Sequence, residues 1–293
     1  MENSQKQRIQ LFEGERSLVM VGLIGFILSL SIAIFIFFQG AVILPEGNMK
    51  DAFSFNAAIG IFILSIAAVL PFAGFTERKR KIIRWSFIVS SIYGYAIETI
   101  QNFRGLDPRF SRMGTVVDAI GGMVFGVMSL VLVMLAIWLT IRFLRMKPPY
   151  ERPLLLLGIR YAFVSVVVAN MAGIWMILLQ DRFTGEAGNL IVLHGIGFHA
   201  LQTLIIPAWL IEKTNVKNSI KKGLVHIGSI AWMLMIILIG IQTGFGRSVF
   251  EFTAFPVLGG LFLLVWFGTV ILTVSLFLKN RRAQSLQRDS LSL

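Results

Sequence analysis

The chain contains no cysteine among its 293 residues. This excludes disulfides, thiolate nucleophiles, Cys-ligated iron–sulfur clusters and Cys-bound zinc, because each of them requires cysteine. Histidine is almost as scarce, with three residues, and acidic residues number only 15 against 27 lysines and arginines. The chain also lacks a glycine-rich phosphate loop with lysine and a serine nucleophile elbow, which disfavours direct nucleotide hydrolysis and serine-hydrolase chemistry.

Apolar sequence, in contrast, is abundant. Hydrophobic residues make up 56% of the chain and the mean hydropathy is +0.79, which is too apolar for a soluble domain of this length. A membrane-spanning helix needs about 20 mostly apolar residues, and eight stretches meet that requirement. They are 17–40, 54–75, 82–101, 115–143, 154–180, 189–209, 223–240 and 252–278. We therefore expect an all-α, polytopic integral membrane helix bundle, with one transmembrane domain over 17–278 between polar tails at 1–16 and 279–293.

The basic residues indicate an orientation for these spans. Alternate connections and the two tails hold 20 of the 27 lysines and arginines, whereas the opposite connections hold six. By the positive-inside rule, both termini lie in the cytoplasm, as an even number of spans requires. The short connections favour a bacterial inner-membrane (cytoplasmic membrane) protein. The net charge of +12 is thereby explained by topology, and we expect the lipid bilayer, not nucleic acid, as partner.

With this topology, polar residues gather toward the non-cytoplasmic ends of the spans. A shared pocket there would make them candidates for binding or for a proton relay, because ionisable side chains inside a membrane are costly. The candidates are Glu98, Gln101, Arg104, Arg109, Asp118, His194, His199, Gln202 and Gln242.

Three kinds of chemistry fit this collection. The first is a divalent-metal or haem site that uses His194, His199 and Glu98, although two histidines five residues apart diverge on a regular helix, where paired ligands favour a spacing of four. The second is a proton or ion path through Glu98, His194, His199 and Gln202. The third is recognition of a small solute or lipid headgroup, in which arginine captures an acidic group while Glu98 or a histidine moves a proton.

We predict solute binding or proton- or ion-coupled transport as the function. The first alternative is a membrane-embedded metal-dependent enzyme or a metal- or haem-binding protein. The second is a structural subunit of a membrane complex, in which buried polar groups only fix helix packing. Whether the chain is an enzyme stays open at this point.

Two further patterns concern the organisation of the chain. Pro71 and Pro207 should kink the second and sixth spans, and Pro207 cannot bond the carbonyl of Thr203. Ile-Gln at 100–101 and again at 241–242, each followed by Phe, Gly and Arg in slightly different order, suggests a parallel repeat of four plus four spans.

One segment resembles a known family. Glu98-x-x-Gln101, Arg109, Asp118 and the glycines from Gly121 to Gly126 are similar to the order of residues in the VanZ-like family of small membrane proteins. The resemblance covers about 30 residues, and Gly121 stands where that family commonly has asparagine. More broadly, the sequence segments that begin at Glu98 and at His194 resemble segments of uncharacterised bacterial multi-span proteins. The resemblance implies an outward-facing site without naming its ligand.

Overall fold

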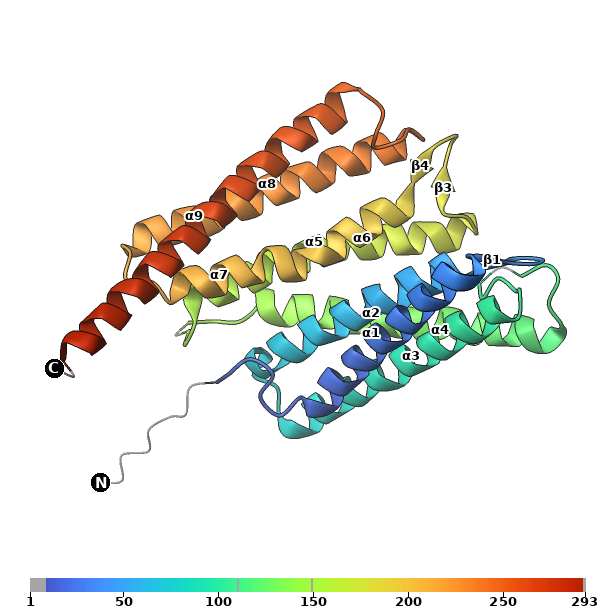
Figure 1. Ribbon diagram of the computed structural model, residues 1–293, viewed down its shortest axis with the longest axis horizontal. Helices are drawn as coiled ribbons and strands as arrows, with labels where there is room; N and C mark the ends of the chain where they lie inside the picture. Colours follow the sequence, from blue (N-terminus) through green and yellow to red (C-terminus); the bar gives the residue numbers. More distant parts are fainter. Residues whose placement is uncertain (1–8, 110, 149, 292–293) are drawn as a thin grey trace. The chain divides into compact units, whose positions relative to one another are not determined.

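The computed structural model describes residues 9–109, 111–148 and 150–291, and helices dominate it (Figure 1). Strands occur in the described residues only as two short antiparallel hairpins. The prediction of an all-α fold is confirmed apart from these hairpins. The chain divides between Leu139 and Thr140 into two compact units, which we call unit 1 (before the division) and unit 2 (after it).

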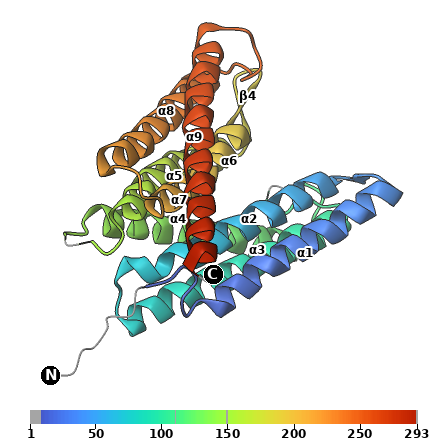
Figure 2. The ribbon, with the colours of Figure 1, turned by 60° about the vertical axis from the view of Figure 1, so that its left-hand side comes forward.

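Unit 1 is a group of long helices joined by one hairpin. In Figure 2, α1 and α2 run side by side with α3, and each pair of these helices is in contact. Where α1 packs against α2, a side chain on Gly22 would meet the Gly60 carbonyl. The elements are α1 (Arg16–Gln39), β1 (Val42–Ile43), β2 (Gly47–Asn48), α2 (Met49–Val69), the 3₁₀ helix η1 (Leu70–Ala73), α3 (Glu77–Phe103) and the first part of α4 (Val116–Leu144).

Unit 2 repeats this order of elements. Helix α5 packs on α6, α7 and α8, and α8 packs on α9, as Figure 2 shows for the orange and red helices. The elements after the end of α4 are α5 (Pro153–Leu179), β3 (Phe183–Thr184), β4 (Gly188–Asn189), α6 (Leu190–Thr203), α7 (Ile205–Glu212), α8 (Asn218–Gly244) and α9 (Ala254–Leu291).

The expected spans and the helices overlap throughout, but α2, α3 and α8 each begin five residues before the predicted start, and the sixth and eighth spans differ as well. Helix α2 begins five residues before the predicted start because the side chain of Asn48 caps it, accepting from the Lys50 amide at 3.1 Å. The predicted sixth span is two helices, α6 and α7, since Pro207 removes a helical hydrogen bond there. Helix α9 continues through 279–291, where we expected a tail.

Seven helical segments of the described chain are long and apolar enough to cross a membrane, with α6 and α7 counted together as one. Helix α3 has comparable length but lower apolarity, because it begins with a charged turn and carries several polar side chains on its buried face. The count of eight spans therefore stays a prediction that depends on α3.

Several elements of the two units lie at the same separation in sequence. Helix α2 begins at Met49 and α6 at Leu190, which is 141 residues later; α3 and α8, both of 27 residues, are separated by the same number. Strand pairing follows this separation too, with 42 opposite 48 and 183 opposite 189. The parallel repeat of four plus four spans stays a prediction, and this regularity agrees with it. Pro71 and Pro207 do not follow the same separation.

A backbone joint fixes each hairpin to the end of a long helix. In unit 1 the Glu46 amide donates to the Gly105 carbonyl at 2.8 Å, and in unit 2 the Ala187 amide donates to Gly246 at 2.9 Å. Both glycines have positive φ, +74° and +73°, and lie against the hairpin where a side chain would collide. We call these two structures the glycine joints, and the part of each unit that contains one its hairpin end.

Candidate functional site

The centre of the candidate site is an ion pair at the hairpin end of unit 1. Glu98, on α3, is fully buried, and its carboxylate contacts the guanidinium of Arg109, which reaches inward from the loop between α3 and α4. The guanidinium carbon lies 5.7 Å from the ring centre of Phe55 and 5.8 Å from that of Phe125. The arginine is thus placed by opposite charge and by two aromatic faces together.

A second ion pair lies at the start of α4. Asp118 accepts from Arg104 at 2.5 Å and from the side chain of Gln101 at 3.0 Å. Its other oxygen accepts from both the amide and the hydroxyl of Thr115, each at 2.8 Å, so the carboxylate satisfies an amide at the start of the helix, as in one half of a capping box. Asp118 therefore joins the end of α3 to the beginning of α4.

In both ion pairs the carboxylate is buried and the arginine is partly exposed. The carboxylate side chains are 0% and 4% exposed for Glu98 and Asp118, whereas their arginine partners Arg109 and Arg104 are 32% and 49% exposed. Buried negative charge therefore lies beneath partly accessible positive charge. Such a rim can attract an acidic group, because arginine binds carboxylate and phosphate oxygens through a planar set of donors.

Glu46 is a site residue that the sequence analysis missed. Its carboxylate accepts from the Ser111 hydroxyl at 2.5 Å and from the Arg112 amide at 2.8 Å, so the hairpin holds the loop that carries Arg109. The hydrogen bond from Ser111, followed by that from Arg112, lowers the pKa of Glu46. The contacts join residues more than 60 positions apart, and no local pattern predicts them.

Further polar side chains lie on the buried face of α3, on both sides of Glu98. The side chain of Asn102 donates to the Glu98 carbonyl at 2.8 Å and accepts from the Asn48 amide at 2.9 Å, which links the ion pair to the hairpin. On the other side of Glu98, nearer the start of the helix, the hydroxyls of Ser91 and Tyr95 are buried without a hydrogen-bond partner among the described residues. These groups place polar atoms in the buried interior of unit 1, where a polar group is costly unless it is hydrogen-bonded.

The histidines of unit 2 have separate partners. His194 lies 2.8 Å from the Ala169 carbonyl through Nδ1, which must carry the proton because a carbonyl only accepts, and its ring packs edge-on against Phe198 at 4.8 Å. His199 is exposed, and its Nδ1 lies 3.1 Å from Oε1 of Gln202. The two rings thus contact different groups, as the five-residue spacing predicted.

Gln242 lies at the hairpin end of unit 2. Its amide donates to the Ser248 carbonyl at 3.0 Å and accepts from the Thr253 hydroxyl at 2.9 Å. Gln101, 141 residues earlier, likewise links the end of its helix to the start of the next. In unit 2, however, these partners carry no charge.

The structure therefore distributes the nine predicted site residues over two units. Unit 1 holds Glu98, Gln101, Arg104, Arg109 and Asp118, and unit 2 holds His194, His199, Gln202 and Gln242. Within the described chain, no three His, Asp or Glu side chains form a group that could hold a metal ion. The metal and haem hypothesis gains no support from this geometry and stays a prediction.

The fold and composition define the class of the protein: with seven helices suited to crossing a membrane in the described residues, it is a multi-pass membrane protein. The chain matches no family model, no curated protein and no solved structure. The resemblance of residues 98–126 to the VanZ-like family stays a prediction.

Proposed function

We propose that the hairpin end of unit 1 binds an oxyanion, either on a small solute or on a lipid headgroup, and couples this binding to proton uptake by Glu98. The protein would act as a solute-binding protein or proton-coupled transporter of the bacterial inner membrane. In this proposal eight helices span the bilayer, both termini are cytoplasmic, and the site faces the other side.

The observation that carries the proposal is the Glu98–Arg109 ion pair. A buried carboxylate must be paired or neutral, because an isolated charge in an apolar interior is very costly. Arg109 is one-third exposed, so an oxyanion arriving from the hairpin end can reach the same guanidinium that Glu98 contacts. The incoming anion and Glu98 then compete for one cation.

Competition of this kind couples binding to protonation. If an oxyanion binds Arg109, the Glu98 carboxylate loses its counter-charge and favours the neutral acid, so one proton is taken up with the ligand. By linkage, protonation of Glu98 in turn strengthens anion binding by the same factor. Arg104, half exposed and fixed by Asp118, supplies a second positive charge at the rim.

The test is proton uptake on addition of ligand to the full chain in weakly buffered nanodiscs. Inorganic phosphate and acetate serve as soluble probes, and discs with phosphatidylglycerol or phosphatidylcholine separate a headgroup from a solute. We expect saturable binding with uptake of up to one proton per ligand. Glu98→Gln should bind the anion without proton uptake, since the amide cannot titrate.

Arg112→Gln is a matched control for Arg109→Gln. Both arginines belong to the same loop, but the Arg112 side chain is exposed, whereas that of Arg109 contacts Glu98. We expect the Arg109 variant alone to lose anion binding. Equal binding by both variants, or proton uptake that persists in Glu98→Gln, would overturn the proposal and favour a purely structural role for the ion pair.

A further inference from the structure

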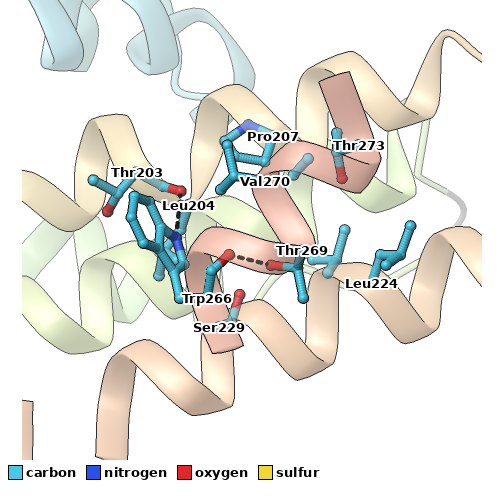
Figure 3. A pocket seen from close by; sticks show the side chains of 11 residues that line it. Thr203, Leu204, Pro207, Leu224, Ser229, Trp266, Thr269, Val270 and Thr273 are labelled. Atoms are coloured by element: carbon cyan, nitrogen blue, oxygen red, sulfur yellow. Dashed lines mark hydrogen bonds between the residues drawn. The ribbon is translucent and has the colours of Figure 1, made fainter. Parts of the chain in front are cut away.

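Unit 2 contains a small cavity where the predicted sixth span breaks. It lies between α7, α8 and α9, and its volume is about 20 Å³ (Figure 3). Its lining combines apolar side chains with hydroxyl groups from three parts of the chain, the polar members being Thr203, Ser229, Thr269 and Thr273. None of the described residues that line it is ionisable.

The break in the helix explains why polar groups gather here. Pro207 has no amide hydrogen, so it cannot bond the Thr203 carbonyl as a continuous helix would require. The indole of Trp266 donates to that carbonyl at 3.2 Å instead, as Figure 3 shows. A side chain from α9 thus supplies one of the hydrogen bonds that the proline removes.

Two of these hydroxyls donate hydrogen bonds within their own helices, and the other two are buried. The Thr203 hydroxyl donates to the His199 carbonyl at 3.0 Å, and the Thr269 hydroxyl donates to the Trp266 carbonyl at 2.7 Å. Each of these oxygens keeps the capacity to accept. Ser229 and Thr273 are each only 2% exposed, so their hydroxyls are removed from bulk solvent.

We infer that this cavity binds one water molecule, which connects the broken helix to α8 and α9. A water needs about 10–15 Å³ of such space and two to four polar partners, and the cavity offers both. A cation is disfavoured, because no carboxylate lines the cavity and a buried charge without a counter-charge is costly. The water acts as a structural ligand of the helix break, independently of the proposed oxyanion site.

The inference can be tested by water-edited solid-state NMR of the full chain in liposomes, with threonine labelled. We expect polarisation transfer from water to Thr269 and Thr273. Thr140 is the internal control, because it is also buried but lies outside the cavity, with its hydroxyl directed to the Phe163 carbonyl at 3.5 Å. The Ser229→Ala/Thr273→Val variant should lose the transfer to Thr269.

Two results would overturn the inference. Transfer to Thr269 and Thr273 no stronger than to Thr140 would mean that the cavity is dry. A change in these signals when sodium chloride replaces choline chloride would mean that a cation is bound. If the double variant does not fold, Ser229→Ala alone should reduce the transfer to Thr269 by about half, because it removes one hydrogen-bond partner of the water.

Discussion

Substituting Arg109 alone should destabilise the protein much more than substituting Arg109 and its charge partner Glu98 together. Breaking a buried ion pair from one side typically costs about 3–5 kcal/mol, because the remaining charge is left uncompensated. Arg109 is 32% exposed, so we take the lower end, about 3 kcal/mol, for Arg109→Met. Loss of the contacts with Phe55 and Phe125 contributes about 1 kcal/mol of that total.

The double variant Glu98→Gln/Arg109→Met leaves no unpaired charge and should lose only about 1 kcal/mol. Glu98→Gln alone should cost about 1 kcal/mol as well, since Arg109 can turn toward solvent. The double-mutant cycle therefore predicts a coupling energy of about 3 kcal/mol. Reversible unfolding in mixed micelles, followed by tryptophan fluorescence, measures each free energy of unfolding. Additive costs, with a coupling energy below about 0.5 kcal/mol, would refute the reasoning.

Three other predictions concern the ends of the helices. The pKa of Glu46 is lowered, so its ionised carboxylate stabilises the loop above the usual pKa near 4.5, and this stabilisation is lost as the pH falls through the lowered pKa. Protease cleavage within 105–114 should therefore rise in that acidic window. Glu46→Ala should show the raised cleavage already at neutral pH. Glu212 accepts from Arg152 at 2.7 Å and caps α5 by accepting from two backbone amides, so Glu212→Ala should lower the free energy of unfolding by about 1–2 kcal/mol, with no loss contradicting the cap. Gly246→Ala forces a side chain into positive φ and should cost about 1–2 kcal/mol in the same assay, whereas Gly195→Ala, where a side chain meets open space, should not.

Much of the fold was predictable because lipid imposes a length and an apolar composition on each span. The helices begin and end close to the apolar runs for this reason. The ends were less predictable: Asn48 begins α2 among polar residues, and only its role as a cap explains the extension. The hairpins were missed, because two-residue strands are too short to show an alternating pattern.

The candidate site was predictable in part. All nine candidate residues were expected to gather at one side of the bundle, and two of them, Gln101 and Asp118, are in direct contact because the end of one helix lies beside the start of the next. The roles of Glu46 and Phe55 were not predictable, because each contacts Arg109 or its loop from a helix or hairpin about 50 or more residues away. Contacts of that range depend on packing between helices, which periodicity alone does not specify.

The matching glycine joints have a consequence for how the chemistry of this chain can be altered. Each joint is built from backbone hydrogen bonds and a glycine, so its geometry does not depend on the charged side chains nearby. In unit 2 the position 141 residues after Glu98 is the apolar Ile239, and the loop that follows the joint runs from 245 to 253, three residues shorter than the loop from 104 to 115 that carries Arg109. The second joint is therefore an uncharged host of similar architecture, onto which an acidic residue can be grafted at position 239 and a basic residue on the shorter loop. A grafted chain would contain two charged sites, and comparing them would separate the contribution of the scaffold from that of the side chains it holds.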